Sequence, residues 1–228
     1  MKTLLHYIKG HIKSEQQASY ALETFHRYSS WDVELVEGVT PDTIDETEYD
    51  IIDLPNGRLS SIRQNEPTKY LIKKSCIFNN LRFYERVILE NEPMAFVEHD
   101  AICCGEAPNV VNEDFVFLSY EYALKQSVFD GRSDLKQYTN ISKLGSNKFP
   151  TDYPLRYYKD SIYKDAIMTP GTCAYIVTPA GARKLLDSAR KNGLEQSDFH
   201  INSHNIELSY CYPSPVRYNI NLNTSHKL

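Results

Sequence analysis

One short segment, residues 94–101, constrains the fold of this chain more than any other. It begins with four mostly apolar residues, Met-Ala-Phe-Val, which follow a long helical pattern and a turn at Glu92-Pro93. A run of this kind predicts a buried strand of a parallel sheet. The strand ends in Glu98, His99 and Asp100. Because ligands bind at the carboxyl ends of strands in open α/β sheets, the segment predicts both an α/β fold and the place of its site.

Glu98 and Asp100 form a candidate site for a divalent metal ion. Residues i and i+2 of an extended segment point to the same side, so the two carboxylates can converge on one cation while His99 points away. Hard oxygen ligands suit Mg²⁺ or Mn²⁺, which usually keep several waters or bind substrate phosphates. The alternative is that the two acids only open a solvated loop.

Composition and charge narrow the class of protein. The 228 residues contain no apolar run near 18, so we expect no transmembrane helix, and the N-terminal apolar stretch is too short for a signal peptide. Five cysteines without zinc-like spacing predict reduced thiols and a cytoplasmic location. The net charge of −5 gives no general attraction to nucleic acid or to anionic membranes, although a local basic face is compatible with it.

The first part of the chain reads as a β-α-β unit, which is how a parallel sheet begins. We expect a strand over 3–9, a helix over 15–29 capped by Ser14, and a strand over 31–36. Residues 41–68 show turn signals without a clear period, and we expect a loop or a small insertion there.

Apolar spacing predicts two further helices, over 68–90 and over 179–191, the second capped by Thr178. Three more strands are predicted, over 115–118, 171–178 and 208–212. Pro213 and Pro215 place the last of these at a sheet edge. Residues 125–165 have no clear period, and we expect either a long loop with a function of its own or a region with short elements that the pattern does not resolve.

Several stretches, taken in chain order, resemble glycosyltransferase family 25. The two specific blocks are residues 96–101 (Phe-Val-Glu-His-Asp-Ala), similar to the family's metal motif, and residues 171–186, similar to its glycine-threonine strand and the helix that follows. Residues 74–87 resemble the family helix that precedes the metal motif. The chain departs from the family pattern at Ser14-Glu15, at Asn79-Asn80 and at His99, the middle position of the metal motif.

The resemblance implies a GT-A-like fold, a single Rossmann-type domain over 1–228 with a mostly parallel sheet flanked by helices. Residues 1–122 would bind the nucleotide sugar and residues 123–228 the acceptor. The implied reaction is transfer of a sugar from a nucleotide-diphosphate donor, with inversion at the anomeric carbon.

The family's functional residues carry over to named positions of this chain. Asp100 and Glu98 would hold Mn²⁺ or Mg²⁺, with His200 or His204 completing the shell, and Asp198 would be the catalytic base that takes the proton of the acceptor hydroxyl. The expected donor contacts are Ile8, Lys9, Asn79, Asn80, Glu98, Gly171 and Thr172.

Three functions remain open from the sequence. The first is transfer to a saccharide such as a lipopolysaccharide core, and the second is a phage-type enzyme acting on 5-hydroxymethylcytosine in DNA. DNA binding would use Lys69, Lys73, Lys74, Arg82 and Arg86, or Lys143, Lys148, Arg156, Lys159 and Lys164. The third is a non-catalytic binder of sugar nucleotides, since fold does not fix function. The sequence sets neither the donor sugar nor the oligomeric state.

Overall fold

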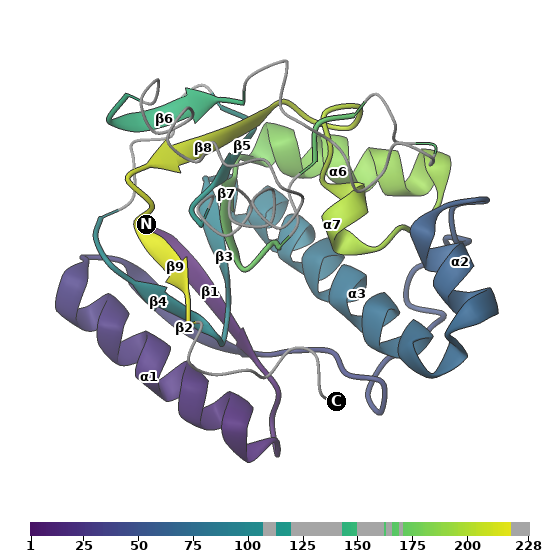
Figure 1. Cartoon of the computed structure of the whole chain (residues 1–228), viewed down its shortest axis with the longest axis horizontal. Coiled ribbons are helices and arrows are strands. Elements are labelled where there is room, and N and C mark those ends of the chain that lie inside the picture. Colours follow the sequence, from purple (N-terminus) through teal and green to yellow (C-terminus); the bar gives the residue numbers. More distant parts are fainter. Residues whose placement is uncertain (107–112, 120–142, 150–161, 163–165, 169–170, 220–228) are drawn as a thin grey trace, which may run out of the picture.

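A computed structural model of the chain describes residues 1–106, 113–119, 143–149, 162, 166–168 and 171–219. Its centre is a seven-stranded sheet with the strand order β2-β1-β3-β7-β5-β8-β6 (Figure 1). The strands of this sheet are β1 (Lys2–Tyr7), β2 (Asp32–Glu37), β3 (Met94–Glu98), β5 (Phe115–Phe117), β6 (Gly145–Lys148), β7 (Ala174–Val177) and β8 (Leu208–Tyr212). A separate two-stranded sheet pairs β4 (Ala101–Cys103) with β9 (Val216–Tyr218).

Most strands of the main sheet run in one direction. β1 is parallel to β2 and β3, and β5 is parallel to β8. β7 is antiparallel to both β3 and β5, so β5 and β8 share the direction of β3. β6 is antiparallel to β8. The predicted α/β class with a mostly parallel sheet is therefore confirmed.

Helices cover both faces of this sheet (Figure 1). They are α1 (Ile12–Tyr28), α2 (Arg58–Asn65), α3 (Pro67–Glu90), α6 (Pro179–Asn192) and the short α7 (Ser197–His200). Alternate residues of β1 and β3 separate two cores: Leu5 and Val97 pack with Phe25 of α1, whereas Leu4 and Phe96 pack with α3. Within the described residues, no helix is long and apolar enough to span a bilayer.

The start of α1 differs from the sequence prediction. The helix begins at Ile12, and its N-cap is His11, whose ring accepts a hydrogen bond from the Ser14 backbone N–H at 3.2 Å. The Ser14 hydroxyl accepts from the backbone N–H of Ile8 at 2.8 Å instead of capping the helix. Ser14 was predicted as the cap because serine is a strong capping residue, but its side chain is used to close the β1–α1 loop.

The predicted edge position of residues 208–212 is wrong. β8 pairs with β5 on one side and β6 on the other, so it lies inside the sheet. Pro213 and Pro215 follow the strand, where they remove no hydrogen bond from its ladder.

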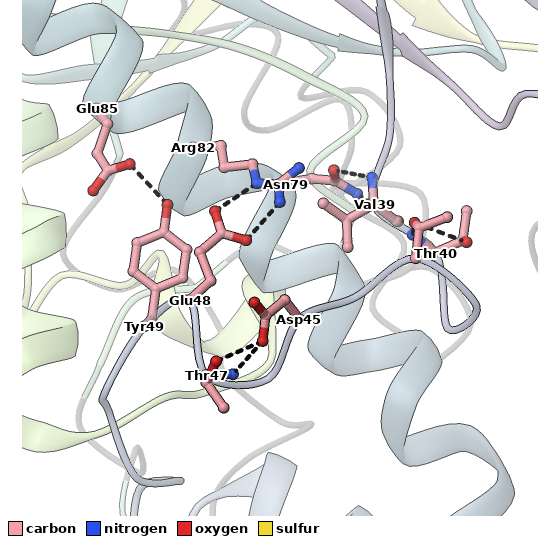
Figure 2. A network of polar contacts seen from close by, with 10 residues as sticks. Val39, Thr40, Asp45, Thr47, Glu48, Tyr49, Asn79, Arg82 and Glu85 are labelled. Carbon is pink, nitrogen blue, oxygen red and sulfur yellow. Dashed lines mark hydrogen bonds and ion pairs between the residues drawn. The ribbon is translucent and has the colours of Figure 1, made fainter.

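The segment that follows β2 is held against α3 by side-chain contacts (Figure 2). Asn79 accepts from the Val39 N–H at 2.6 Å and donates to the Val39 carbonyl at 3.1 Å. Further along, Glu48 accepts from Arg82 Nε at 2.7 Å, and the Tyr49 hydroxyl donates to Glu85 at 2.8 Å. These contacts and helix α2 order residues 41–68. The turn signals in the sequence revealed neither of them.

Helix α6 begins where it meets the chain before β5. The Thr178 backbone N–H donates to the Asp114 carbonyl at 3.1 Å, and the Thr178 hydroxyl caps the helix by accepting from the Gly181 N–H at 3.2 Å. A Cβ at Gly181 would overlap the Asp114 carbonyl oxygen. This position therefore requires glycine because of close backbone approach.

We expect Gly181→Ala to destabilise the chain by about 1–3 kcal/mol through this overlap, although alanine is the better helix former. Thermal unfolding should show a lower Tm. Gly105→Ala is the matched control, because a Cβ there meets no atom within 4 Å. A Gly181→Ala variant as stable as the control would show that the two backbones can separate without cost.

Candidate active site

The carboxyl end of β3 lies beside the loop that enters β7. The Glu98 backbone N–H donates to the Cys173 carbonyl at 2.8 Å, which joins the two segments just beyond their strand pairing. After Glu98 the chain turns, and β4 begins at Ala101. Asp100 is in this turn and only 2% exposed, and its carbonyl accepts from the Asn219 N–H at 2.8 Å. The acids of the motif are thus fixed by the backbone on both sides.

Glu98 and Asp100 are held in an unfavourable electrostatic environment. Burial, together with the negative charges of Asp100 and Asp198, raises the pKa of Glu98 to about 8, against the opposing charge of Lys73. Burial also raises the pKa of Asp100 to about 6, against a hydrogen bond from Tyr218. Within the described residues, one carboxylate oxygen of Asp100, Oδ1, is buried with no hydrogen-bond partner. Nothing there offsets the loss of hydration of this oxygen.

Helix α7 brings Asp198 to the same place. Burial raises the pKa of Asp198, while the charge of Lys73 lowers it, as do hydrogen bonds from the Gly171 backbone and from the side chains of Gln196 and Thr172. Gln196 Nε2 lies 3.4 Å from Asp198 Oδ2. Gly171 has a φ of +84°, a conformation that favours glycine. Five predicted site positions, Glu98, Asp100, Gly171, Thr172 and Asp198, are therefore brought together.

The predicted donor contacts Asn79 and Asn80 make bonds within the protein. Asn79 holds Val39, as described above. Asn80 is buried, donates to Ser197 Oγ at 3.1 Å and accepts from the Tyr175 hydroxyl. It thereby ties α3 to α7, one residue before Asp198. Both asparagines act in the described structure as supports of the site, and direct contact with a donor stays a prediction.

Ile8 and Lys9, the other predicted donor contacts, follow the end of β1. The Ile8 backbone N–H donates to Ser14, and the exposed Lys9 ammonium lies 3.1 Å from Glu37 Oε2 at the end of β2. The Ile8 N–H and one donor of the Lys9 ammonium therefore have partners within the protein. Contact between these residues and a donor stays a prediction.

His200 does not join Glu98 and Asp100. Its Nε2 lies 3.0 Å from the Leu185 carbonyl, in the contact between α7 and α6, and burial lowers its pKa to about 4. In the described part of the chain, no three His, Cys, Asp or Glu side chains are grouped so that they could hold a metal ion. The three-ligand set of Glu98, Asp100 and His200 is thus not assembled, because the His200 ring faces a helix backbone.

Two carboxylates are still compatible with a divalent cation. Mg²⁺ is commonly bound by one or two carboxylates together with waters and substrate phosphates. The Asp100 oxygen without a partner among the described residues could bind a cation, and the positive charge would oppose the effect of burial, which raises the pKa of both acids. The residues present therefore fit a divalent ion held by Asp100 and Glu98.

Three residues near the site were not singled out for it from the sequence. Tyr218 donates to Asp100 because β9 pairs with β4, a pairing between segments over one hundred residues apart that no local pattern predicts. Lys73 acts on Glu98 and Asp198 from α3. His6 is opposite Glu98 in the β1–β3 register and stacks on Phe96 with a centroid distance of 4.4 Å. Both of its ring nitrogens are buried, with no hydrogen-bond partner in the part of the chain that the structure describes.

A comparison with known protein families matches residues 9–201 to the family described as "Glycosyltransferase family 25 (LPS biosynthesis protein)". This match includes β3 with Glu98, the turn after it with Asp100, and α7 with Asp198. The chain belongs to glycosyltransferase family 25. As a member of that family it is a glycosyltransferase, which confirms the resemblance found in the sequence.

Other comparisons add little to the family match. No curated protein matches the chain. Among solved structures, the chain is similar to the galactosyltransferase LgtC in complex with donor and acceptor sugar analogues, with 9% sequence identity and a TM-score of 0.39. That alignment covers 92% of this chain and 73% of LgtC. A TM-score this low does not establish a shared fold, so nothing about the site is drawn from LgtC.

We expect Glu98→Gln to stabilise the metal-free protein at pH 8.5 and to have much less effect at pH 5. The folded-state pKa of Glu98, about 8, lies above its unfolded value, so protonated Glu98 favours folding at low pH and this contribution is lost as the pH rises through 8. Glutamine carries no charge at any pH, so the variant does not lose this stability at high pH. Melting curves in a chelator should show a Tm gain of roughly 2–8 °C at pH 8.5.

The control for this measurement is Glu23→Gln on α1, an exposed position whose Tm should not change with pH relative to the wild type. An equal Tm gain for Glu98→Gln at both pH values would show that glutamine acts through packing and not through the charge.

Proposed function

We propose that this glycosyltransferase moves a sugar from a nucleoside-diphosphate donor to a hydroxyl of a saccharide acceptor, with inversion and with a divalent metal ion. The observation that carries the proposal is the gathering of Glu98, Asp100 and Asp198 at the carboxyl end of β3, in a chain whose family is established. We further propose that 1–228 acts as one catalytic domain in the cytoplasm.

Asp198 is the proposed catalytic base. In an inverting transfer, a carboxylate takes the proton of the acceptor hydroxyl while that oxygen forms its bond to the anomeric carbon and the diphosphate leaves from the opposite face. Burial raises the basicity of Asp198, and the Gly171 and Thr172 hydrogen bonds fix its orientation. The opposing effects of burial and of these hydrogen bonds suit a group that must be charged before it accepts a proton.

Asp100 and Glu98 are the proposed holders of Mn²⁺ or Mg²⁺. When bound, the ion would supply positive charge to the departing diphosphate. Tyr218 and the Asn219 backbone fix the turn that carries Asp100. Gly171 and Thr172 are the proposed wall of the donor pocket, since they lie between β7 and Asp198.

A saccharide acceptor is supported by the family's description and by the charges of α3. Four of the five basic residues of this helix are paired with acids: Lys69 with Glu66, Lys74 with Glu46, Arg82 with Glu48, and Arg86 with Glu90. Lys148 likewise pairs with Glu207. Paired cations are poorly suited to neutralise phosphates of DNA. Arg156, Lys159 and Lys164, the rest of the second cluster apart from Lys143, lie outside the described residues.

Active chemistry is favoured over non-catalytic binding by the same acids. A protein that only bound a sugar nucleotide would have no need for an acid such as Asp198 beside the metal pair, where its charge raises the pKa of Glu98. Replacing such a group by a neutral one would be expected to stabilise the fold. Its presence supports catalysis.

We expect Asp198→Asn to lower kcat by about 10²- to 10⁴-fold, because the amide cannot accept the proton. The assay measures transfer from a panel of nucleotide sugars to a lipopolysaccharide core oligosaccharide, to plain DNA and to DNA containing 5-hydroxymethylcytosine. Asp187→Asn is the control, since Asp187 is exposed on α6. Transfer of sugar to the modified DNA and to no other acceptor would contradict the proposed saccharide acceptor. Full activity of Asp198→Asn would show that Asp198 is not the catalytic base.

A further inference from the structure

Lys73 differs from the other basic residues of α3. Each of the other four has a carboxylate within 4.0 Å. Within the described residues, Lys73 has no ion pair at this distance and is half-buried. Its neighbour Lys74, by contrast, is buried and bound to Glu46 at 2.5 Å. The ammonium of Lys73 thus keeps its three hydrogen-bond donors.

The helical period places Lys73 on the face of α3 that meets the site. Residues 73, 76 and 80 are three and four apart and so share one side of the helix. Asn80 binds Ser197 of α7 at 3.1 Å, which fixes this side against the residue before Asp198. Burial raises the pKa of the Cys76 thiol to about 11, and the negative charge of Glu98 adds to this effect, so Cys76 also lies near the acids.

Lys73 is one turn nearer the start of α3 than Cys76, and it is the described cation whose charge acts on both Glu98 and Asp198. A lysine whose role was only to neutralise these acids would be expected to pair directly with one of them, just as each other α3 cation pairs directly with a carboxylate of its own. Lys73 instead lies near enough to influence both acids and too far to pair with either. That position is suited to a third group, an anion of the substrate.

We propose that the Lys73 ammonium binds a phosphate group of the substrate at the rim of the active site. This inference rests on the proposed function, because it assumes that a phosphate-bearing substrate approaches Asp198 and Glu98. Lysine binds phosphate as a compact point charge and needs no fixed geometry. The phosphate belongs either to the diphosphate of the donor or to a phosphorylated acceptor saccharide, and the chemistry at Lys73 is the same for both.

The test uses Lys73→Met, which keeps the apolar stem and removes the charge, and Lys73→Arg, which keeps the charge. Lys13→Met is the control, because Lys13 is exposed on α1. Calorimetry in a chelator measures binding of UDP and GDP and of the corresponding nucleosides. If Lys73 binds a phosphate of the donor, Lys73→Met should bind the diphosphates at least tenfold more weakly and the nucleosides as tightly as the wild type does. Lys73→Arg should then recover part of the lost diphosphate affinity.

A second arm measures KM for an oligosaccharide acceptor before and after phosphatase treatment. If Lys73 instead binds a phosphate of the acceptor, Lys73→Met should raise KM at least tenfold for the phosphorylated acceptor. The KM for the phosphatase-treated acceptor should not change. Unchanged diphosphate affinity together with unchanged preference for the phosphorylated acceptor would overturn the role of Lys73 and leave the proposed function standing. A wild-type protein that neither binds a diphosphate nor transfers sugar to any acceptor would overturn both.

Discussion

At the carboxyl end of β3 the dominant physical constraint is the free-energy cost of removing carboxylates from water. Asp100 is buried and Glu98 is half-buried, and the negative charges of Asp100 and of Asp198 on α7 both act against the charge of Glu98. In a chain selected only for stability, such a group would be replaced, because neutral side chains of similar size pack there without this penalty. Clustered acids with raised pKa values are typical of sites that bind a cation or move a proton.

The surrounding structure offsets part of this cost and fixes the acids. Tyr218 and Asn219 bind Asp100 from β9 and the chain after it, while Gly171 and Thr172 bind Asp198 from the loop before β7. Helix α3 contributes from a third direction, through Asn80 bound to α7 and through the charge of Lys73. Because these supports come from distant parts of the chain, the site forms only when the whole sheet has formed.

Much of the fold could be predicted from the sequence, since β3, α3 and α6 have long apolar patterns that specify their type locally. The site was harder. The acid-x-acid segment indicated Glu98 and Asp100, whereas Gly171, Thr172 and Asp198 came from the resemblance to the family. The pairing of β4 with β9, which delivers Tyr218, and the packing of α3 on α7, which turns Asn80 inward, depend on tertiary contacts that no local pattern encodes.

The most direct test of this account is Mn²⁺-dependent sugar transfer by Asp100→Asn, with Mn²⁺ binding followed separately by the metal-induced shift in Tm. Asparagine keeps the shape of the side chain and removes the charge that would hold the ion. We expect transfer to fall by at least about 100-fold, loss of the Mn²⁺-induced Tm shift, and an unchanged fold. Wild-type turnover by this variant, with or without a chelator, would contradict the assignment of the buried acids as the catalytic centre.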